Sequence, residues 1–173
     1  MALLRAVTLA FFAFCLLGCP LRGAGQVEDA LNAGSNVPLL PDGSPTAEPC
    51  PQRARDLMRA LGLRAGVGAL AEIDANQRQR EPLTVFSGPV ESELTEPRYP
   101  LQRGTRFYGR IWATKRGVVI RYYHAAMPDR ETFPICAVAR RDAGELEGKP
   151  GAYPGAVELE SSTALIWIVE DFR

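Results

Sequence analysis

Between residues 67 and 172 the chain alternates short runs of β-branched and aromatic residues with turns rich in Gly, Pro and charged residues. The runs are 67–73, 83–86, 105–114, 118–127, 133–139, 156–159 and 164–172. Runs of this length and composition predict β-strands, and their close spacing predicts antiparallel neighbours. We therefore expect a mainly β fold. The pattern is compatible with either a small antiparallel β-barrel or a sandwich.

One short N-terminal α-helix is expected before these strands. Pro51 suits the first position of a helix, and Gly62 is a typical C-terminal stop. Between them, apolar residues recur at the spacing of a single helical stripe. The stripe consists of Ala54, Leu57, Met58 and Leu61. Three arginines lie off the stripe and are expected on its solvated face: Arg53, Arg55 and Arg59.

The runs 105–114 and 118–127 predict a hairpin, because Lys115, Arg116 and Gly117 lie between them. A slip of one residue moves every side chain to the other face of a sheet, so face consistency selects the register. It favours a two-residue turn at Arg116 and Gly117 over a three-residue loop. One face then carries apolar residues: Phe107, Ile111, Ala113, Val118, Ile120 and Tyr122. The other face carries Arg106, Tyr108, Arg110, Trp112, Arg121 and Tyr123.

This second set, the arginine–aromatic face, is the candidate ligand face. Guanidinium groups bind carboxylates or phosphates through paired hydrogen bonds, and sugar rings or acyl chains can rest on aromatic side chains. A structural interpretation stands beside this one. The acidic segment that follows would neutralise the arginines, and the aromatic rings would pack on the arginine stems.

The N-terminus predicts export. Arg5 is followed by an almost unbroken apolar run over residues 6–17, which spans about 18 Å as a helix against the roughly 30 Å core of a bilayer. We therefore interpret 1–18 as a lipoprotein signal peptide. The segment Leu16-Leu17-Gly18-Cys19 is similar to a bacterial lipobox, which predicts acylation of Cys19, with palmitate among the expected modifications. Ordinary cleavage after the small residues 23–25, giving a secreted protein, is the alternative.

The remaining chain divides into two parts. Residues 19–49 are rich in Pro, Gly, Ser and Ala and are expected to form a flexible tether, because they offer little apolar surface to bury. Residues 50–173 are expected to form a single globular β-rich domain. Within it, Cys50 and Cys136 are a candidate disulfide in an oxidising compartment, the alternative being two buried free thiols.

Composition limits the chemistry. The formal net charge is 0, so bulk attraction to nucleic acid is not expected. There is 1 histidine, His124, and no CxxC spacing, so neither a metal site nor a cofactor is expected. The chosen register points His124 to the apolar face. The carboxylate pairs Glu91/Glu93 and Glu158/Glu160 have the spacing of the solvent side of a strand.

A set of dipeptides along the domain carries a family resemblance. The residues are Cys50-Pro51, Gly104-Thr105, Tyr108-Gly109, Trp112, Thr114, Arg121-Tyr122, Ala125, Pro128-Asp129, Pro134-Ile135-Cys136 and Lys149-Pro150-Gly151-Ala152. They resemble a family of short predicted lipoproteins of myxobacteria. The likeness covers about residues 50–155, and Arg130 departs from it where a Gly often follows Pro-Asp. Gly104-Thr105 and Gly109-Arg110 are also similar to the outer-membrane barrel domain of conjugation and secretion channels.

Members of the lipoprotein family often carry the label serine/threonine protein kinase, and the residues do not support that activity. A kinase needs a strand lysine, an HRD base and a DFG metal ligand. Here Lys115 and Lys149 lie in predicted turns, and His124 is followed by two alanines.

We therefore expect a lipid-anchored protein of the bacterial cell envelope, on the periplasmic side or the cell surface. Its expected role is that of a non-catalytic binding or accessory module. The expected partners are the lipid bilayer, through acylated Cys19, and an envelope protein or an anionic glycan. The alternatives are a structural subunit of an envelope or secretion complex and a hydrolase that uses His124.

Overall fold

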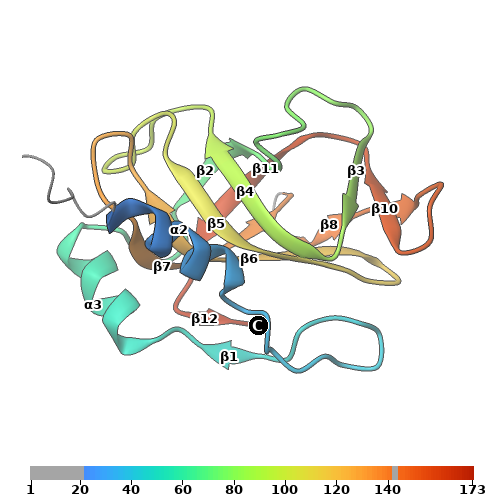
Figure 1. Cartoon of the computed structure of the whole chain (residues 1–173), viewed down its shortest axis with the longest axis horizontal. Coiled ribbons are helices and arrows are strands. Elements are labelled where there is room, and N and C mark those ends of the chain that lie inside the picture. Colours follow the sequence, from blue (N-terminus) through green and yellow to red (C-terminus); the bar gives the residue numbers. More distant parts are fainter. Residues whose placement is uncertain (1–21, 142–143) are drawn as a thin grey trace, which may run out of the picture.

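The structure, a computed structural model, describes residues 22–141 and 144–173 (Figure 1). The expected signal peptide over residues 1–18 and the expected lipidation site at Cys19 lie outside the described residues. Among the helices that are described, none is long and apolar enough to cross a membrane. The fold is mainly β, as the sequence predicts, and it is a barrel.

The barrel consists of 6 antiparallel strands. In spatial order they are β5 (Arg106–Ala113), β4 (Gly88–Leu94), β2 (Gly68–Glu72), β11 (Thr163–Ile168), β7 (Phe133–Arg140) and β6 (Gly117–Ala126). Strand β6 pairs in turn with β5, which closes the barrel. Closure leaves these strands without the unpaired edges of an open sheet.

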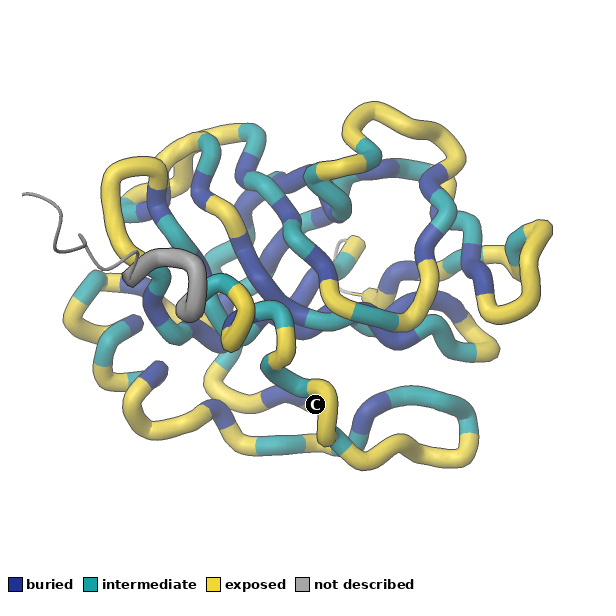
Figure 2. Tube along the Cα trace, in the orientation of Figure 1, coloured by how far each residue is buried: buried dark blue, intermediate teal, exposed yellow. Residues whose placement is uncertain are grey.

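The barrel interior is the core of the molecule, and Figure 2 shows buried residues running along its strands while the loops are exposed. Alternate residues of each strand face inward, as in β4, where Val90, Ser92 and Leu94 are buried. Inside, the Tyr122 ring meets the edge of Phe107 at a centroid distance of 5.6 Å. The Tyr122 hydroxyl and Ser92 Oγ are hydrogen-bonded at 2.7 Å. Side chains therefore fill the barrel.

Smaller strands extend the barrel. Strand β3 (Leu83–Phe86) pairs with β10 (Ala156–Leu159), which pairs with β9 (Lys149–Pro150), and this three-stranded sheet lies at the right of Figure 1. Strand β8 (Leu146–Glu147) pairs with β6. The expected strand 164–172 is divided into β11 and β12 (Asp171–Phe172), and β12 pairs with β1 (Glu48–Pro49).

The β5–β6 hairpin differs from the expected register. Ala113 pairs with Val118, and Thr114 N donates to Gly117 O at 2.9 Å, so the turn is Lys115-Arg116 instead of Arg116-Gly117. Gly117 lies in the strand, where β8 passes so closely that a Cβ would come within 2.2 Å of Leu146 O. Because the pairing shifts by an even number of residues, the expected division of the two faces still holds next to the turn.

Two irregularities change the faces further along the hairpin. The register shifts between Tyr108 and Gly109 in β5 and between Tyr122 and His124 in β6. His124 consequently pairs with Tyr108 and lies on the outer face, which corrects the prediction that it faces the apolar interior. A β-bulge has this effect because its extra residue reverses the alternation of the strand.

Two helices pack on the outside of the barrel. Helix α3 (Gln52–Ala60) lies on β7, with Ala54 and Met58 buried, and Gly62 follows its end with a φ of 74°. The predicted helix and its apolar stripe are thus confirmed. Helix α2 (Arg22–Asn32) contacts β5 and β4 and lies within the stretch for which the sequence predicts a flexible tether.

Residues 33–49, which we call the strap, also differ from the predicted tether. Leu40 N donates to Ser44 O at 2.8 Å, and Thr46 N donates to Pro38 O at 2.8 Å. The strap ends in β1, and it contacts the outer face of the barrel through polar groups described below. The prediction considered apolar burial alone, whereas hydrogen bonds hold this segment.

The strap leads directly into a disulfide. Cys50 and Cys136 are joined, which decides between the two alternatives that the sequence leaves open. Cys50 precedes Pro51, the N-cap residue of α3, and Cys136 belongs to β7. Both residues are buried. The bond therefore fixes the beginning of α3 to the strand on which the helix packs.

Candidate functional site

The arginine–aromatic face is largely covered by the chain itself. Arg121 is 1% exposed. Its Nη1 donates to Thr46 O at 2.9 Å and its Nη2 to Pro45 O at 3.2 Å, both on the strap. The guanidinium also lies 5.3 Å from the centroid of the Phe172 ring of β12. The strap therefore supplies acceptors for both Nη atoms of this buried cation, whereas its Nε has no hydrogen-bond partner among the described residues.

Glu48 completes this contact. Its Oε1 accepts hydrogen bonds from Tyr123 Oη at 2.7 Å and from Arg121 Nη1 at 3.4 Å. Burial is the main cause that raises the pKa of Tyr123 above its usual value, and the hydrogen bond to Glu48 adds to the effect. Trp112 is buried with its ring centroid 5.7 Å from the guanidinium of Arg121. The aromatic rings therefore lie beside the arginine as the structural interpretation expects, but the neutralising carboxylate belongs to the strap and not to the acidic segment that follows.

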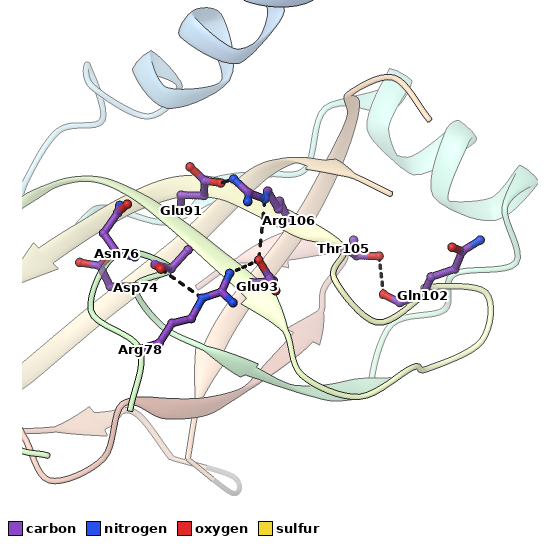
Figure 3. A network of polar contacts seen from close by, with 9 residues as sticks. Asp74, Asn76, Arg78, Glu91, Glu93, Gln102, Thr105 and Arg106 are labelled. Carbon is purple, nitrogen blue, oxygen red and sulfur yellow. Dashed lines mark hydrogen bonds and ion pairs between the residues drawn. The ribbon is translucent and has the colours of Figure 1, made fainter. Parts of the chain in front are cut away.

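The other members of the face lie further along β5. Arg106 pairs with Glu91 and, through Nε, lies 3.8 Å from Glu93 (Figure 3). Arg78 pairs with the same Glu93. The Glu91 carboxylate raises the pKa of Arg106. These charges neutralise one another on the outside of the barrel, so they leave no cationic site there.

Tyr108 and Arg110 complete the six predicted residues. Tyr108 is buried, and burial is the main cause that raises the pKa of its hydroxyl. Arg110 is partly exposed, and it lies opposite Arg121 in the strand register of the β5–β6 hairpin. The six residues therefore lie on one side of the hairpin but do not form one open ligand face.

His124 is partly buried on the outer face of β6. Burial lowers its pKa below the ordinary value of 6.5; the Asp29 charge opposes this effect and the Arg53 charge adds to it. Its Nδ1 is buried and has no hydrogen-bond partner within the described ranges. Cys136 of the neighbouring strand β7 is bonded to Cys50 and is not a free thiol.

The second predicted carboxylate pair also has cationic neighbours. Glu160 lies 3.8 Å from Arg141 and 3.7 Å from Lys149. Glu158 and Glu160 line a hollow of about 310 Å³ together with these two cations. Across the part of the chain that the structure describes, no group of three His, Cys, Asp or Glu residues is placed to hold a metal ion.

A different set of arginines forms the strongest candidate site. Two hollows of about 460 and 310 Å³ adjoin between α3 and the end of β11, and we call them together the α3–β11 groove. The two hollows share four lining residues: Ala65, Ile168, Val169 and Glu170. Five arginines line the groove: Arg55, Arg59, Arg64, Arg140 and Arg173. Glu170 and Asp171 are its acidic residues, so the groove has an excess of positive charge.

The arginines of the groove differ in their partners. Arg55 donates to Cys50 O at 2.7 Å, and Arg59 lies 3.3 Å from Asp56, so both have contacts within α3 or at its start. Arg64, Arg140 and Arg173 form no ion pair with any described residue. Three guanidinium groups are therefore available to an anion.

Trp167 supplies an aromatic surface in the same groove. It lies on the outer face of β11, where it pairs with Gly68 of β2 and Val138 of β7. A Cβ on Gly68 would come within 3.1 to 3.2 Å of three atoms of the indole ring, so the ring lies against the Gly68 backbone. A side chain at position 68 would therefore press on the indole ring.

Comparison of the chain with protein-family models, with curated proteins and with solved structures finds no match. The residues of the candidate site are consequently assigned from their positions in the structure alone.

Sequence reasoning placed Arg55 and Arg59 on a solvated helix face and did not single out the rest of the groove. The missed residues come from four separate segments: Arg64, Arg140, Trp167 and Arg173. The available signal was weak. Arg140 and Trp167 each fall at a partly exposed strand position, which many strands fill without a ligand.

Proposed function

We propose that this chain is a lipid-anchored, non-catalytic binding or accessory module of the bacterial cell envelope, and that the α3–β11 groove binds an anionic ligand. One observation carries the proposal: Arg64, Arg140 and Arg173 line two adjoining hollows together with Trp167 and have no ion-pair partner in the described chain. Guanidinium groups in such a setting form strong, charge-assisted hydrogen bonds with carboxylates and phosphates.

The contacts of the potentially reactive groups support a binding role over catalysis. Cys50 and Cys136 are bonded to each other, and Arg121, Tyr123 and Glu48 bind one another. A general base must reach the proton that it takes. His124 lies partly buried outside the barrel, with Asp29 and Arg53 as its charged neighbours.

The envelope location is supported by the lipobox-like Leu16-Leu17-Gly18-Cys19, by the resemblance to short myxobacterial lipoproteins and by the disulfide, since disulfides persist in oxidising compartments. With Cys19 acylated, α2 starts only a few residues after the anchor. The barrel would then stay close to the bilayer surface, instead of moving on a tether of some 30 residues.

The groove is tested with the full-length chain and three anionic probes: oligogalacturonate, oligoglutamate and polyphosphate. We expect at least one to bind, with an affinity that falls as salt rises. Arg64→Gln/Arg140→Gln should weaken that binding at least about tenfold, since each lost charge-assisted hydrogen bond costs about 1.5 kcal/mol or more. The control, Arg98→Gln/Arg130→Gln, removes two exposed arginines outside the groove and should leave the affinity unchanged. Equal losses in both variants, or no binding by any probe, would overturn the proposal.

The anchor is tested by mass. Wild type from native membranes should carry the mass of a diacyl or triacyl group. Cys19→Ser should lose that mass and leave the membrane fraction, whereas Cys15→Ser should keep both, because its cysteine lies within the signal sequence. Unmodified wild-type protein would contradict a lipid anchor.

A structural subunit is the second candidate, favoured by two exposed aromatic residues, one on the three-stranded sheet and one in the loop between its strands β9 and β10. Phe86 is 51% and Tyr153 67% exposed, and both lie next to Ala156: Phe86 as its β-sheet partner, and Tyr153 as its hydrogen-bond acceptor. Crosslinking in membranes should then give a stoichiometric complex that Phe86→Ser/Tyr153→Ser abolishes. Tyr99→Ser, at a residue 92% exposed on another loop, is the control.

A further inference from the structure

We propose that the ligand of the α3–β11 groove is an acidic glycan, a chain of sugar rings that bear carboxylates, and that Trp167 is the platform on which one ring stacks. This inference rests on the proposed function, because it names the class of anion that the groove binds. It depends on three features of the groove: the orientation of Trp167, the distribution of its arginines and the presence of two carboxylates.

The first feature is the surface that Trp167 offers. One side of the indole lies against Gly68, and Nε1 is buried without a hydrogen-bond partner among the described residues. The partly exposed indole therefore presents ring carbons to a ligand, with no hydrogen-bond donor. Aromatic faces carry negative charge, so they do not attract a bare phosphate or carboxylate. The apolar C–H face of a sugar ring is the group that packs well on such a surface.

The second feature is the spread of the arginines along the groove. Arg140 and Arg173 line the same hollow as Trp167, whereas Arg64 lines the adjoining hollow near α3. An extended ligand that stacks on Trp167 can therefore contact Arg140 and Arg173 in the same hollow and Arg64 in the adjoining hollow. An acidic glycan matches this arrangement, since it alternates ring faces with carboxylates along one chain.

The third feature distinguishes a glycan from other polyanions. Glu170 lies where the two hollows meet, and Asp171 lines the Trp167 hollow. Carboxylates repel the closely spaced charges of a polyphosphate or an oligoglutamate, but they accept hydrogen bonds from sugar hydroxyls. The mixed lining thus favours a ligand that carries hydroxyl groups between its negative charges.

The test compares hexagalacturonate with three probes of similar length: neutral maltohexaose, hexaglutamate and a short polyphosphate. Titration calorimetry on the full-length chain should give an affinity for hexagalacturonate at least about tenfold above the other three. Trp167→Leu should weaken hexagalacturonate binding about tenfold, because the stacking surface is lost, and should not change polyphosphate binding. Trp167→Phe should keep most of the affinity. Leu165→Ala, on the same face of β11 but outside the groove, is the matched control.

A second measurement does not depend on a folded variant. Magnetisation transferred from aromatic protons of wild type should reach the ring protons of hexagalacturonate, and maltohexaose should compete weakly. If polyphosphate or hexaglutamate binds as tightly as hexagalacturonate, or if Trp167→Leu folds and binds normally, the glycan inference is wrong while the anion groove stands. If no probe binds, the proposed function fails together with the inference.

Discussion

Arg121 is a fully buried cation whose partners come from the strap, 73 to 76 residues earlier in the sequence. Carbonyl oxygens of Pro45 and Thr46, together with the Glu48 carboxylate, satisfy its Nη atoms. Removing one member of a buried charged set leaves the others without partners, which costs more than the contact contributes. Arg121 therefore links the barrel to the strap energetically.

We expect Arg121→Met to lower the free energy of unfolding by about 3 kcal/mol, because it leaves strap carbonyls and Glu48 without their cation. Arg110→Met is the matched control. Arg110 pairs with Arg121 across the hairpin but is partly exposed, and the effect should stay below about 1 kcal/mol. Urea unfolding measures both. A similar loss in the two variants would show that the strap does not depend on the buried guanidinium.

His124 makes stability depend on pH in a defined direction. Burial lowers its pKa in the folded chain below the ordinary 6.5, so near that pH the unfolded chain binds the proton more readily. Stability should therefore decrease as pH falls from about 7.5 through 6.5 and on to the lowered folded pKa. His124→Gln should reduce this dependence between pH 7.5 and 5.5 in urea unfolding. Since the chain has 1 His, an unchanged slope would contradict the assignment.

At the scale of elements, the β5–β6 pair depends on Gly109. The register shifts beside it, and a Cβ there would come within 2.0 Å of Arg121 O. Gly109→Ala should therefore destabilise the chain by about 2–3 kcal/mol, as overpacking against rigid backbone does. Gly88→Ala in β4 is the control, because its Cβ would meet nothing within 4 Å. Thermal unfolding that ranks the two variants equally would exclude the close strand approach.

The predictable elements are those with a local apolar pattern. The stripe of α3 follows from its apolar spacing, and the strands 83–86 and 156–159 follow from short runs of strand-forming residues between turns. Strand β4 is not among the predicted β-branched runs, because Gly88 and Pro89 begin it, although the spacing of Glu91 and Glu93 already indicates the solvent side of a strand. The bulge that turns His124 outward could not be predicted, since it arises from the pairing of three strands.

At the scale of the molecule, tertiary contacts determine what is open to a ligand. Sequence periodicity grouped the arginine–aromatic face correctly near the turn, but the segments that cover it lie far away in the sequence. Those segments are the strap and β12, which pair through β1. Sequence periodicity does not group the residues of the α3–β11 groove. Its arginines come from segments with no common pattern, so only the folded barrel brings them together.

The disulfide connects two distant parts of the chain: it links the start of α3 to β7 across a sequence separation of 86. In the chain-entropy account, closing so long a loop restricts the unfolded state and stabilises the native chain by about 2–4 kcal/mol. Cys50→Ala/Cys136→Ala should lower the free energy of unfolding by that amount in urea, and it should loosen α3, which forms one wall of the groove. Binding of the anionic probe should weaken in this variant more than in Leu57→Met, which keeps the bond and alters the packing of α3 at a residue that does not line the groove. Native protein whose thiols react with alkylating reagent before reduction would contradict the bond, and an unchanged unfolding midpoint would show that α3 is held by packing alone.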